Sequence, residues 1–545
     1  MTLTKNAKKQ LRARIFRYLD GIVCVPTAFT LYRYGIFEKL ADLESHALKD
    51  LTVEFKANEG YLNVALRIMC SQGWMSQEFT AGDQEIRYAL TPSGKLAIPY
   101  LSLYEEVAAF IPEAIKMEDY IIHGFPAGTF MKLKTLFQKC SRKFDIRKAS
   151  NAQEQEIQHQ IAMHLEGAIA GPLIVSLGIS GLFNKYFTVA PFEVEEFTEH
   201  HNEFREVINF FESLGWFTRN GNTFNFTPEG VFFAKRAGAY GVTVSYLPTF
   251  MRLNDLLFGN PGILWDKPAN TPEIHVNRRM NVWGSGAAHS GYFTKVDEII
   301  LDIFNKPIHE QPKGFIDMGC GDGTLLVHIF EVIYRRTLRG KLLDEYPLFI
   351  IGADYNEAAL SATRNTLNQA DIWAKVVWGD IGQPDMLADN IKSKYELNLE
   401  DLLHVRSFLD HNRIYQPPEK VDDQRQSKST GAFAFRGEKL SNNAVEENLI
   451  NHFKNWMPYV KQYGLLVIEL HTIPSKLVAK NLGNTPATAY DATHGFSDQY
   501  ILELDCFLEA AAEAGLFPDT QHQYKFPNSD LATVSINILK SKEYL

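Results

Sequence analysis

Four polar residues follow an apolar, strand-like run in the C-terminal half of the sequence. The run LLHVRSFL ends in Asp410, His411, Asn412 and Arg413. A carboxylate and an imidazole at the end of a buried strand suit a general base or ligands of a divalent ion. We therefore assign Asp410 and His411 to catalysis, with the alternative that His411 is a strand-end histidine paired with Asp410.

A glycine-rich turn lies about ninety residues earlier, between an apolar strand and the helical stretch LLVHIFEVIYR. It contains Asp317, Gly319, Gly321 and Gly323. Glycines let the backbone turn tightly and approach a ligand without obstruction by Cβ atoms. The spacing differs from the GxGxxG of dinucleotide folds. The strand–loop–helix context predicts a cofactor site that includes these four residues.

Acidic residues also end the next two apolar runs. Asp354 suits a hydrogen bond to a ribose diol, and Asp380 can accept one from an adenine amino group. Each could instead be an ordinary turn residue. Arg406 is assigned to the same cofactor set, although its guanidinium could anchor a carboxylate substrate or pair with Glu469.

The elements that must position these residues alternate between strands and helices from about residue 300 onward. Short apolar runs rich in β-formers occupy residues 315–319, 348–354, 374–380, 401–409 and 464–470. Alternation with helices predicts an α/β fold with a parallel, doubly wound sheet. In such sheets, ligands bind beyond the carboxyl ends of the strands.

The N-terminal half contains a degenerate repeat of two helices, Gly-Trp, a short strand, Thr-Pro-x-Gly and a helix. Its two copies span residues 32–40, 62–75 and 88–95, and residues 176–186, 206–217 and 224–231. The middle segments carry apolar residues at helical spacing. This order predicts two winged-helix-like units, whose helices lack the basic side chains of a DNA reader and favour packing or dimerisation.

We therefore predict four segments: winged-helix-like units at 1–120 and 166–285, a helical linker at 121–165, and a Rossmann-like seven-stranded domain at 286–545. A polar insertion at 416–443 follows the fourth predicted strand. A loop this long is often a lid. We expect it to close the pocket or to recognise a carrier.

The DMGCGDG turn, Asp354 and Asp380, in this order, resemble class I S-adenosylmethionine-dependent methyltransferases. The resemblance covers about residues 290–545. It implies that Asp317 and the glycines bind the methionine moiety and that Asp354 binds the ribose. Small-molecule O-methyltransferases of this class typically end the fourth strand in Leu-His-Asp-Trp, with the histidine as base. Here the order is inverted, and Asp410 occupies the position of that histidine.

A metal site is a further expectation. His411, His494 and Gln499 are assigned as ligands, with Asp410 as a further oxygen donor, and a mixed set of this kind suits Fe or Mn. The structural alternatives are that His494 caps a helix and that Gln499 faces solvent. The segments VRSFLDHNRIY, GLLVIELH and DATHGFSDQY also resemble the mononuclear iron-dependent C-methyltransferases associated with polyketide synthases. That resemblance implies a metal that chelates a dicarbonyl substrate and stabilises its enolate.

The composition of the whole chain limits the kinds of molecule and the compartment that we expect for the protein. The chain has 545 residues, a formal net charge of −10 and a pI of about 5.9. An acidic balance argues against general nucleic-acid binding. No uninterrupted apolar run reaches the length of a membrane span. The basic, amphipathic N-terminus lacks the core of a signal peptide, and the five cysteines are far apart, so we expect a cytoplasmic protein.

Three functions remain open from the sequence. The first is a methyltransferase that acts on an acidic carbon of a malonyl- or 3-oxoacyl-type substrate, assisted by a metal, in polyketide or other secondary metabolism. The second is a metal-independent O-methyltransferase. The third is a non-catalytic winged-helix regulator that senses S-adenosylmethionine. The expected partners are a small or carrier-bound acyl substrate, an acyl carrier protein and a second copy of the chain.

Overall fold

The protein forms two compact units in a computed structural model. The structure describes residues 3–42, 45–80, 85–266, 271, 273–286, the backbone of 287–289, and residues 292–421 and 425–544. The first unit comprises Met1–Ala288, Arg436–Lys439 and Pro474–Ser497. The second comprises His289–Phe435, Leu440–Ile473 and Asp498–Leu545.

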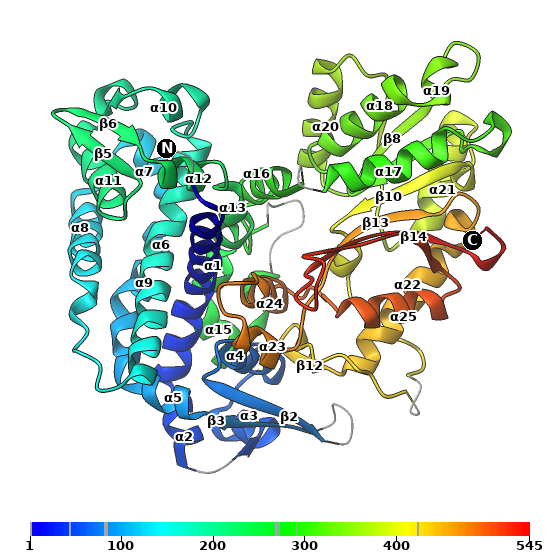
Figure 1. Cartoon of the computed structure of the whole chain (residues 1–545). Helices are drawn as coiled ribbons and strands as arrows, with labels where there is room; N and C mark the ends of the chain where they lie inside the picture. The colour runs from blue at the N-terminus through cyan, green and yellow to red at the C-terminus, as the bar shows by residue number, and fades with distance from the viewer. Residues whose placement is uncertain are drawn as a thin grey trace. The chain divides into compact units, whose positions relative to one another are not determined.

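Two long antiparallel helices, α1 (Lys5–Arg33) and α9 (Ala152–Ile179), form the centre of the first unit (Figure 1). Glycines allow their close contact: a Cβ added to Gly21 would lie 2.3 Å from the carbonyl oxygen of His164. Helix α9 is long and apolar enough to span a membrane by composition alone, but 72% of its most apolar window is buried inside the unit. It is packed as a core helix.

Both predicted winged-helix motifs are present in the first unit. The first copy contains α4 (Glu59–Ser71), β2 (Met75–Thr80), β3 (Glu85–Leu90) and α5 (Pro92–Ala97), with β1 (His46–Ala47) completing a sheet of order β1-β3-β2. The second contains α11 (His201–Ser213), β5 (Phe217–Asn220), β6 (Thr223–Phe226) and α12 (Pro228–Ala234), with β4 (Phe192–Glu193) in a sheet of order β4-β6-β5.

The repeated Thr-Pro-x-Gly has the same structural role in both copies. The hydroxyls of Thr91 and Thr227 each accept a hydrogen bond from the glycine N–H three residues later, at 3.0 Å. This is the N-cap interaction expected of threonine before a helix. A Cβ added to Gly94 or Gly230 would lie about 2 Å from the carbonyl oxygen of the tryptophan that precedes the hairpin. Glycine is required because the helix start packs directly on that backbone.

The second unit is built on a seven-stranded sheet of order β14-β15-β13-β10-β7-β8-β9. The strands are β7 (Gly314–Met318), β8 (Phe349–Asp354), β9 (Lys375–Trp378), β10 (Leu402–Ser407), β13 (Leu465–Leu470), β14 (Phe517–Phe526) and β15 (Val534–Lys540). The first five are parallel, and β15 pairs antiparallel with both β13 and β14. The predicted Rossmann-like α/β fold is confirmed.

Helices cover both faces of this sheet (Figure 1). One core joins it to α17 (Phe293–Phe304), α18 (Thr324–Arg336) and α20 (Glu357–Gln369). The other core joins it to α21 (Pro384–Tyr395), α22 (Asn442–Val460) and α25 (Leu504–Glu513). Because side chains alternate along a strand, β10 sends Val405 to the first core and Arg406 toward α22.

The polar insertion is packed against helices α22 and α25 along much of its described length. Arg425 forms an ion pair with Glu446 of α22 at 3.3 Å. Ser429 and Thr430 both donate hydrogen bonds to Glu503, which precedes α25. Residues 422–424 lie outside the described part of the chain. The role of the insertion as a lid or carrier-recognition element stays a prediction.

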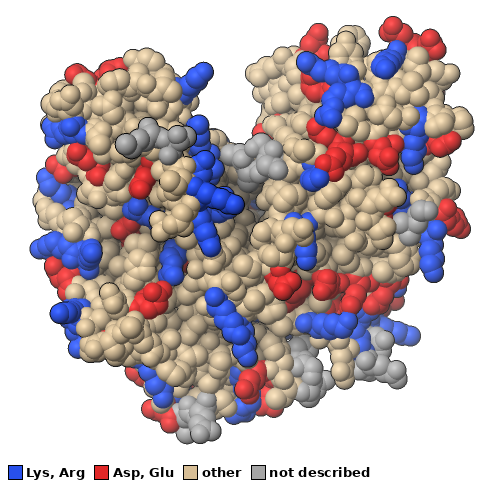
Figure 2. All heavy atoms as spheres, viewed as in Figure 1, with Lys and Arg blue, Asp and Glu red and all other residues tan. Residues whose placement is uncertain are grey.

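Charged side chains of both signs are distributed over the face drawn in Figure 2. Lysine and arginine side chains alternate there with aspartate and glutamate side chains. This distribution matches the mixed composition of the sequence, which has 55 basic and 65 acidic residues.

Candidate active site

The glycine-rich turn follows β7 and adopts the conformation that its glycines allow. Gly319, Gly321 and Gly323 have φ values of +80°, +55° and +80°, which other residues rarely adopt. A Cβ added to Gly321 would have no atom within 4 Å, whereas one at Gly319 would lie 2.9 Å from the side chain of Leu409. The turn is thus open at Gly321 and packs against the end of β10 at Gly319.

Three acids end three neighbouring strands, as predicted. Asp317 is 1% exposed and one of its carboxylate oxygens, Oδ1, has no hydrogen-bond partner among the described residues. Burial, together with the charges of Asp354 and Asp322, raises the pKa of Asp317 well above its ordinary value. Asp354 accepts a hydrogen bond from the Gly321 N–H at 3.3 Å. A cationic ligand would relieve the repulsion between Asp317 and Asp354.

Asp380 follows β9 and caps a turn. Its carboxylate accepts hydrogen bonds from the N–H of Gly382 at 2.8 Å and from the Gln383 side chain at 3.0 Å. These are the contacts of a turn aspartate. Its predicted contact with an adenine stays a prediction.

The end of β10 has an unusual backbone. Phe408 has a φ of +55°, a conformation that is rare for an aromatic residue. The chain then forms a single 3₁₀ turn, Asp410–Asn412. Backbone strain of this kind persists where the surrounding structure enforces it, often at functional sites.

Asp410 points toward α22 and is completely buried. Its Oδ1 accepts hydrogen bonds from Arg406 Nη1 at 2.5 Å and from His452 Nε2 at 2.8 Å. Burial by itself would raise the pKa of Asp410, but the Arg406 charge and the contact with His452 hold it well below its usual range. Asp410 and Arg406 are both 0% exposed. The predicted catalytic role of Asp410 and cofactor role of Arg406 stay predictions, and these contacts describe an internal ion pair.

His411 is bound by a different carboxylate. Its Nδ1 lies 2.5 Å from Glu469 Oε1, and its backbone N–H donates to Glu469 Oε2 at 3.2 Å. The contacts described for these residues thus join His411 to Glu469 and Arg406 to Asp410. Glu469 lies in β13, which is the parallel neighbour of β10. Because the Glu469 carboxylate can only accept, His411 Nδ1 donates the hydrogen bond between them.

The three predicted metal ligands are divided between the two units. The backbone N–H of Tyr500 donates to the carbonyl of His411 at 2.9 Å, so the neighbouring Gln499 is brought near His411 within the second unit. His494 lies in α24 (Ala487–Gly495), in the first unit. Its Nδ1 lies 2.7 Å from the carbonyl oxygen of Tyr490. Among the described residues, His, Cys, Asp and Glu form no group of three that could hold a metal ion. This does not test a site that includes Gln499.

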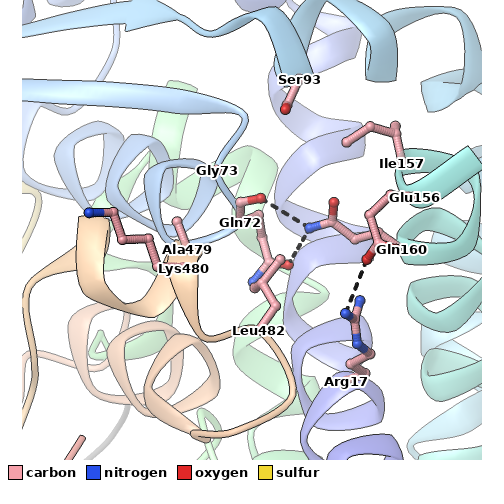
Figure 3. Close-up of a pocket in the computed structure, with 10 residues that line it drawn as sticks. All are labelled: Arg17, Gln72, Gly73, Ser93, Glu156, Ile157, Gln160, Ala479, Lys480 and Leu482. Carbon is pink, nitrogen blue, oxygen red and sulfur yellow. Dashed lines mark hydrogen bonds and ion pairs between the residues drawn. The ribbon is translucent and has the colours of Figure 1, made fainter. Parts of the chain in front are cut away.

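A pocket lies in the first unit (Figure 3). It has a volume of about 290 Å³ and is bordered by α1, α4, α9 and the end of α23 (Ser475–Lys480). Four of its polar side chains contact one another: Gln160 donates to Gln72 at 2.9 Å, and Arg17 pairs with Glu156 at 3.2 Å. These satisfied contacts indicate a structural role.

Comparisons with known families identify the class of the protein. A family model described as the AprA MT2-like domain matches residues 273–537, which include the seven-stranded sheet and the glycine turn. Models described as the AprA N-terminal domain and the AprA winged helix domain match residues 11–77 and 166–260. The chain is a class I S-adenosylmethionine-dependent methyltransferase.

Several solved structures match the chain at low sequence identity and low TM-score. An O-methyltransferase family protein from Burkholderia thailandensis is 13% identical, over 68% of this chain and 95% of its own, with a TM-score of 0.38. The mitomycin 7-O-methyltransferase MmcR is 11% identical, over 72% of this chain and 99% of its own, with a TM-score of 0.41. The DszA carbon methyltransferase is 10% identical, over 74% of this chain and 95% of its own, with a TM-score of 0.26. A search of curated proteins found no significant match.

Two partners of the predicted site residues, Glu469 and His452, were not among the assigned site residues. Glu469 was considered from the sequence as a partner of Arg406, and its contact with His411 was not predicted. His452 gives no local signal, since it is one of several polar residues on α22 and its partner Asp410 lies 42 residues earlier.

Proposed function

We propose that this methyltransferase moves the methyl group of S-adenosylmethionine to an acidic carbon of a malonyl- or 3-oxoacyl-type substrate, in polyketide or other secondary metabolism. The observation that carries this proposal is the His411–Glu469 pair beside the glycine turn. A carboxylate that holds the Nδ1 proton fixes the ring and its tautomer, as is common for metal-binding histidines.

The residues of the glycine turn fit the proposed cofactor. S-adenosylmethionine carries an ammonium and a sulfonium group, and the repulsion between Asp317 and Asp354 favours a cation at this position. Asp317 Oδ1 provides a buried acceptor for the ammonium group. The open space at Gly321 admits close approach of the ligand to the backbone. Asp354 and Asp380 would then contact the ribose and the adenine.

The predicted ligands fit a divalent ion by their chemistry. His411 and His494 each place Nδ1 beside an oxygen of the protein, from Glu469 and from the Tyr490 carbonyl. Together with the amide oxygen of Gln499, they would hold Fe or Mn. Such an ion, when bound, supplies Lewis-acid stabilisation of an enolate. The acidic carbon would lose a proton to give the enolate, and the enolate carbon would then take the methyl group, with S-adenosylhomocysteine as the leaving group.

The proposed partner is an acyl carrier protein or coenzyme A that delivers the acyl substrate. The insertion at 416–443 supports this proposal because it is packed beside the helices that cover the end of β10. We also propose that the winged-helix-like units form a homodimer. Their helices lack the basic side chains of a DNA reader, which favours packing or dimerisation.

The same His411–Glu469 pair also fits the second candidate, a metal-independent O-methyltransferase. A histidine held by a carboxylate is a competent general base for a hydroxyl group. The regulator without catalytic activity is set aside, since the chain is an enzyme of the methyltransferase class.

One experiment separates the candidates. The protein is incubated with isotope-labelled S-adenosylmethionine and a panel of malonyl- and 3-oxoacyl-loaded carrier proteins, with Fe²⁺, Mn²⁺ or a chelator, and mass spectrometry locates the added methyl group. A carbon-methylated product that disappears with the chelator and in His411→Ala supports the proposal. Methylation on oxygen that persists with the chelator supports the second candidate. Methylation that persists in His411→Ala contradicts both.

A further inference from the structure

The direction of the His411 side chain depends on a very short segment of chain. Between the end of β10 at Ser407 and His411, the backbone passes through the positive φ of Phe408 and enters one 3₁₀ turn. Within that turn, the N–H of Asn412 donates to the carbonyl of Leu409 at 2.9 Å. A single turn of this length does not hold a conformation by itself, so contacts with other elements must fix it.

The first of these contacts is the buried carboxylate of Asp410. Arg406 reaches it from β10 and His452 reaches it from α22, both at Oδ1. The Arg406 guanidinium lies 4.1 Å from the ring centre of Trp456, one helical turn after His452. The Asp410 side chain is therefore held between a strand and a helix.

The second contact comes from the residue that follows the turn. Arg413 is 4% exposed and donates to Asn448 Oδ1 at 2.7 Å, to the Val445 carbonyl at 3.1 Å and to the Asp410 carbonyl at 2.8 Å. Two of these acceptors belong to α22. The turn is thus attached to the same helix before and after His411.

Because of these contacts, the consecutive side chains of Asp410 and His411 point toward different elements. Because Asp410 is directed toward α22, the next residue, His411, is directed toward Glu469 of β13. Rotation of the turn would move both side chains together. We propose that Arg406, Arg413 and His452 are positioning residues that hold His411 against Glu469, with α22 as their common support. This inference rests on the proposed function, in which His411 is the reactive or metal-binding group.

The polar atoms of this cluster argue against a purely stabilising role. Arg406 Nε and Nη2 and Asp410 Oδ2 are buried and have no hydrogen-bond partner among the described residues. A buried ion pair with unsatisfied atoms adds little net stability and is often equalled by apolar side chains of similar size. A role in fixing geometry explains why charges occupy this position.

The test compares two substitutions at His452. His452→Phe keeps a ring but removes the donor to Asp410, whereas His452→Gln keeps an N–H at the position of Nε2. We expect His452→Phe to lower kcat for a malonyl-loaded carrier protein about 10- to 100-fold, the usual range for residues that orient a ligand-binding histidine. His452→Gln should restore kcat to within about threefold of the wild type. The Kd for S-adenosylmethionine, measured by calorimetry, should change less than about twofold in both.

Nuclear magnetic resonance gives a second readout that needs no substrate. A proton in the 2.5 Å contact between His411 and Glu469 should resonate far downfield, and its signal is assigned by its loss in His411→Ala. We expect this signal to shift or broaden in His452→Phe and to remain in His452→Gln. His404→Gln is the matched control: His404 also lies on β10 and contacts Trp456, with its ring 5.8 Å away, but it bonds to the Leu399 carbonyl instead of Asp410.

The outcomes are distinguishable. Wild-type kcat together with an unchanged downfield signal in folded His452→Phe would overturn the inference. If His452→Phe does not fold, Asn448→Ala, which removes one acceptor of Arg413, must reproduce the loss of kcat and the shifted signal; otherwise the inference fails. Full activity in His411→Ala, with a shifted signal in His452→Phe, would overturn the proposed function while the positioning role stands.

Discussion

Two buried polar clusters of this methyltransferase differ in charge and in how fully their polar atoms are hydrogen-bonded. In the first unit, Gln72, Gln160, His164 and Trp74 form an uncharged cluster in which Gln72 Oε1 accepts from Gln160 and Gln160 Oε1 accepts from the Trp74 ring. In the second unit, Arg406, Asp410 and His452 form a charged cluster with buried atoms that have no described partner. Both lie in the interior, where an unpaired polar group is costly.

The difference agrees with the roles that we propose, a structural one for the uncharged cluster and a positioning one for the charged cluster. Burial lowers the pKa of His164 to about 3, so this ring stays neutral and bonds to Gln72 Oε1 and the Tyr104 hydroxyl. In the charged cluster, Arg406 and His452 stabilise the ionised form of Asp410. Neutral groups that satisfy one another join helices, whereas the charged groups direct a turn next to His411.

The largest effect is expected when one charge is removed from the second cluster. Arg406→Met leaves the Asp410 carboxylate buried without its cation and should lower the free energy of unfolding by about 3–5 kcal/mol. Chemical denaturation of the purified variant measures this change. The double variant Arg406→Met/Asp410→Leu should recover most of the loss, because both charges of this pair are then removed together. A loss below about 1 kcal/mol in the single variant would contradict the described ion pair.

The first unit should show a pH effect that depends on one buried acid. Burial raises the pKa of Asp20 from 3.8 to about 7, despite hydrogen bonds with Gln72 and Thr488 and the charge of Arg17. The folded state therefore keeps a proton that the unfolded state loses, and stability falls as the pH rises from about 4 to about 7. Asp20→Asn should remove up to about 4 kcal/mol of this fall, at about 1.4 kcal/mol per pKa unit.

Denaturation curves of the wild type and Asp20→Asn at several pH values test this prediction. The difference in the free energy of unfolding between the wild type and Asp20→Asn reports on Asp20, because the contribution of His164 is present in both proteins and cancels. The lowered pKa of His164 makes stability rise with pH over part of the same range. A constant difference between pH 4 and pH 8 would contradict a raised pKa at Asp20.

A smaller effect, on catalysis instead of stability, is expected at the carboxylate of the His411 pair. Glu469→Gln keeps the size of the side chain but removes the charge that holds the Nδ1 proton of His411. We expect activity to fall about 10- to 100-fold, with unchanged cofactor affinity. Steady-state kinetics with the carrier-bound substrate and calorimetry with S-adenosylmethionine measure the two quantities. Equal losses of cofactor affinity and activity would instead place Glu469 at the cofactor.

The smallest effect is expected in the uncharged cluster. Gln160→Leu leaves the Trp74 N–H without its acceptor and removes one of the two donors to Gln72 Oε1, and should cost about 1–3 kcal/mol of stability. Methyl transfer by the folded variant should match that of the wild type. Loss of activity without loss of stability would show that the first unit's cluster also supports chemistry.

Much of the fold could be predicted from local patterns. The strand–helix alternation, the repeated Thr-Pro-x-Gly and the acids Asp317, Asp354 and Asp380 at strand ends each depend on a few neighbouring residues. Backbone preferences and side-chain periodicity act over such short distances. The seven-stranded sheet and the two winged-helix motifs followed from these patterns.

Pairing between side chains at the end of β10 could not be predicted in the same way. Asp410 and His411 are adjacent in sequence and were expected to act together, yet Asp410 bonds to His452 and His411 to Glu469, 42 and 58 residues later. These partners are set by the order of strands in the sheet and by the helix that covers it. The sequence alone therefore determined which chemical groups follow the end of the β10 strand. Only the tertiary structure decided which carboxylate holds the histidine, because contacts across neighbouring elements depend on packing rather than on spacing along the chain.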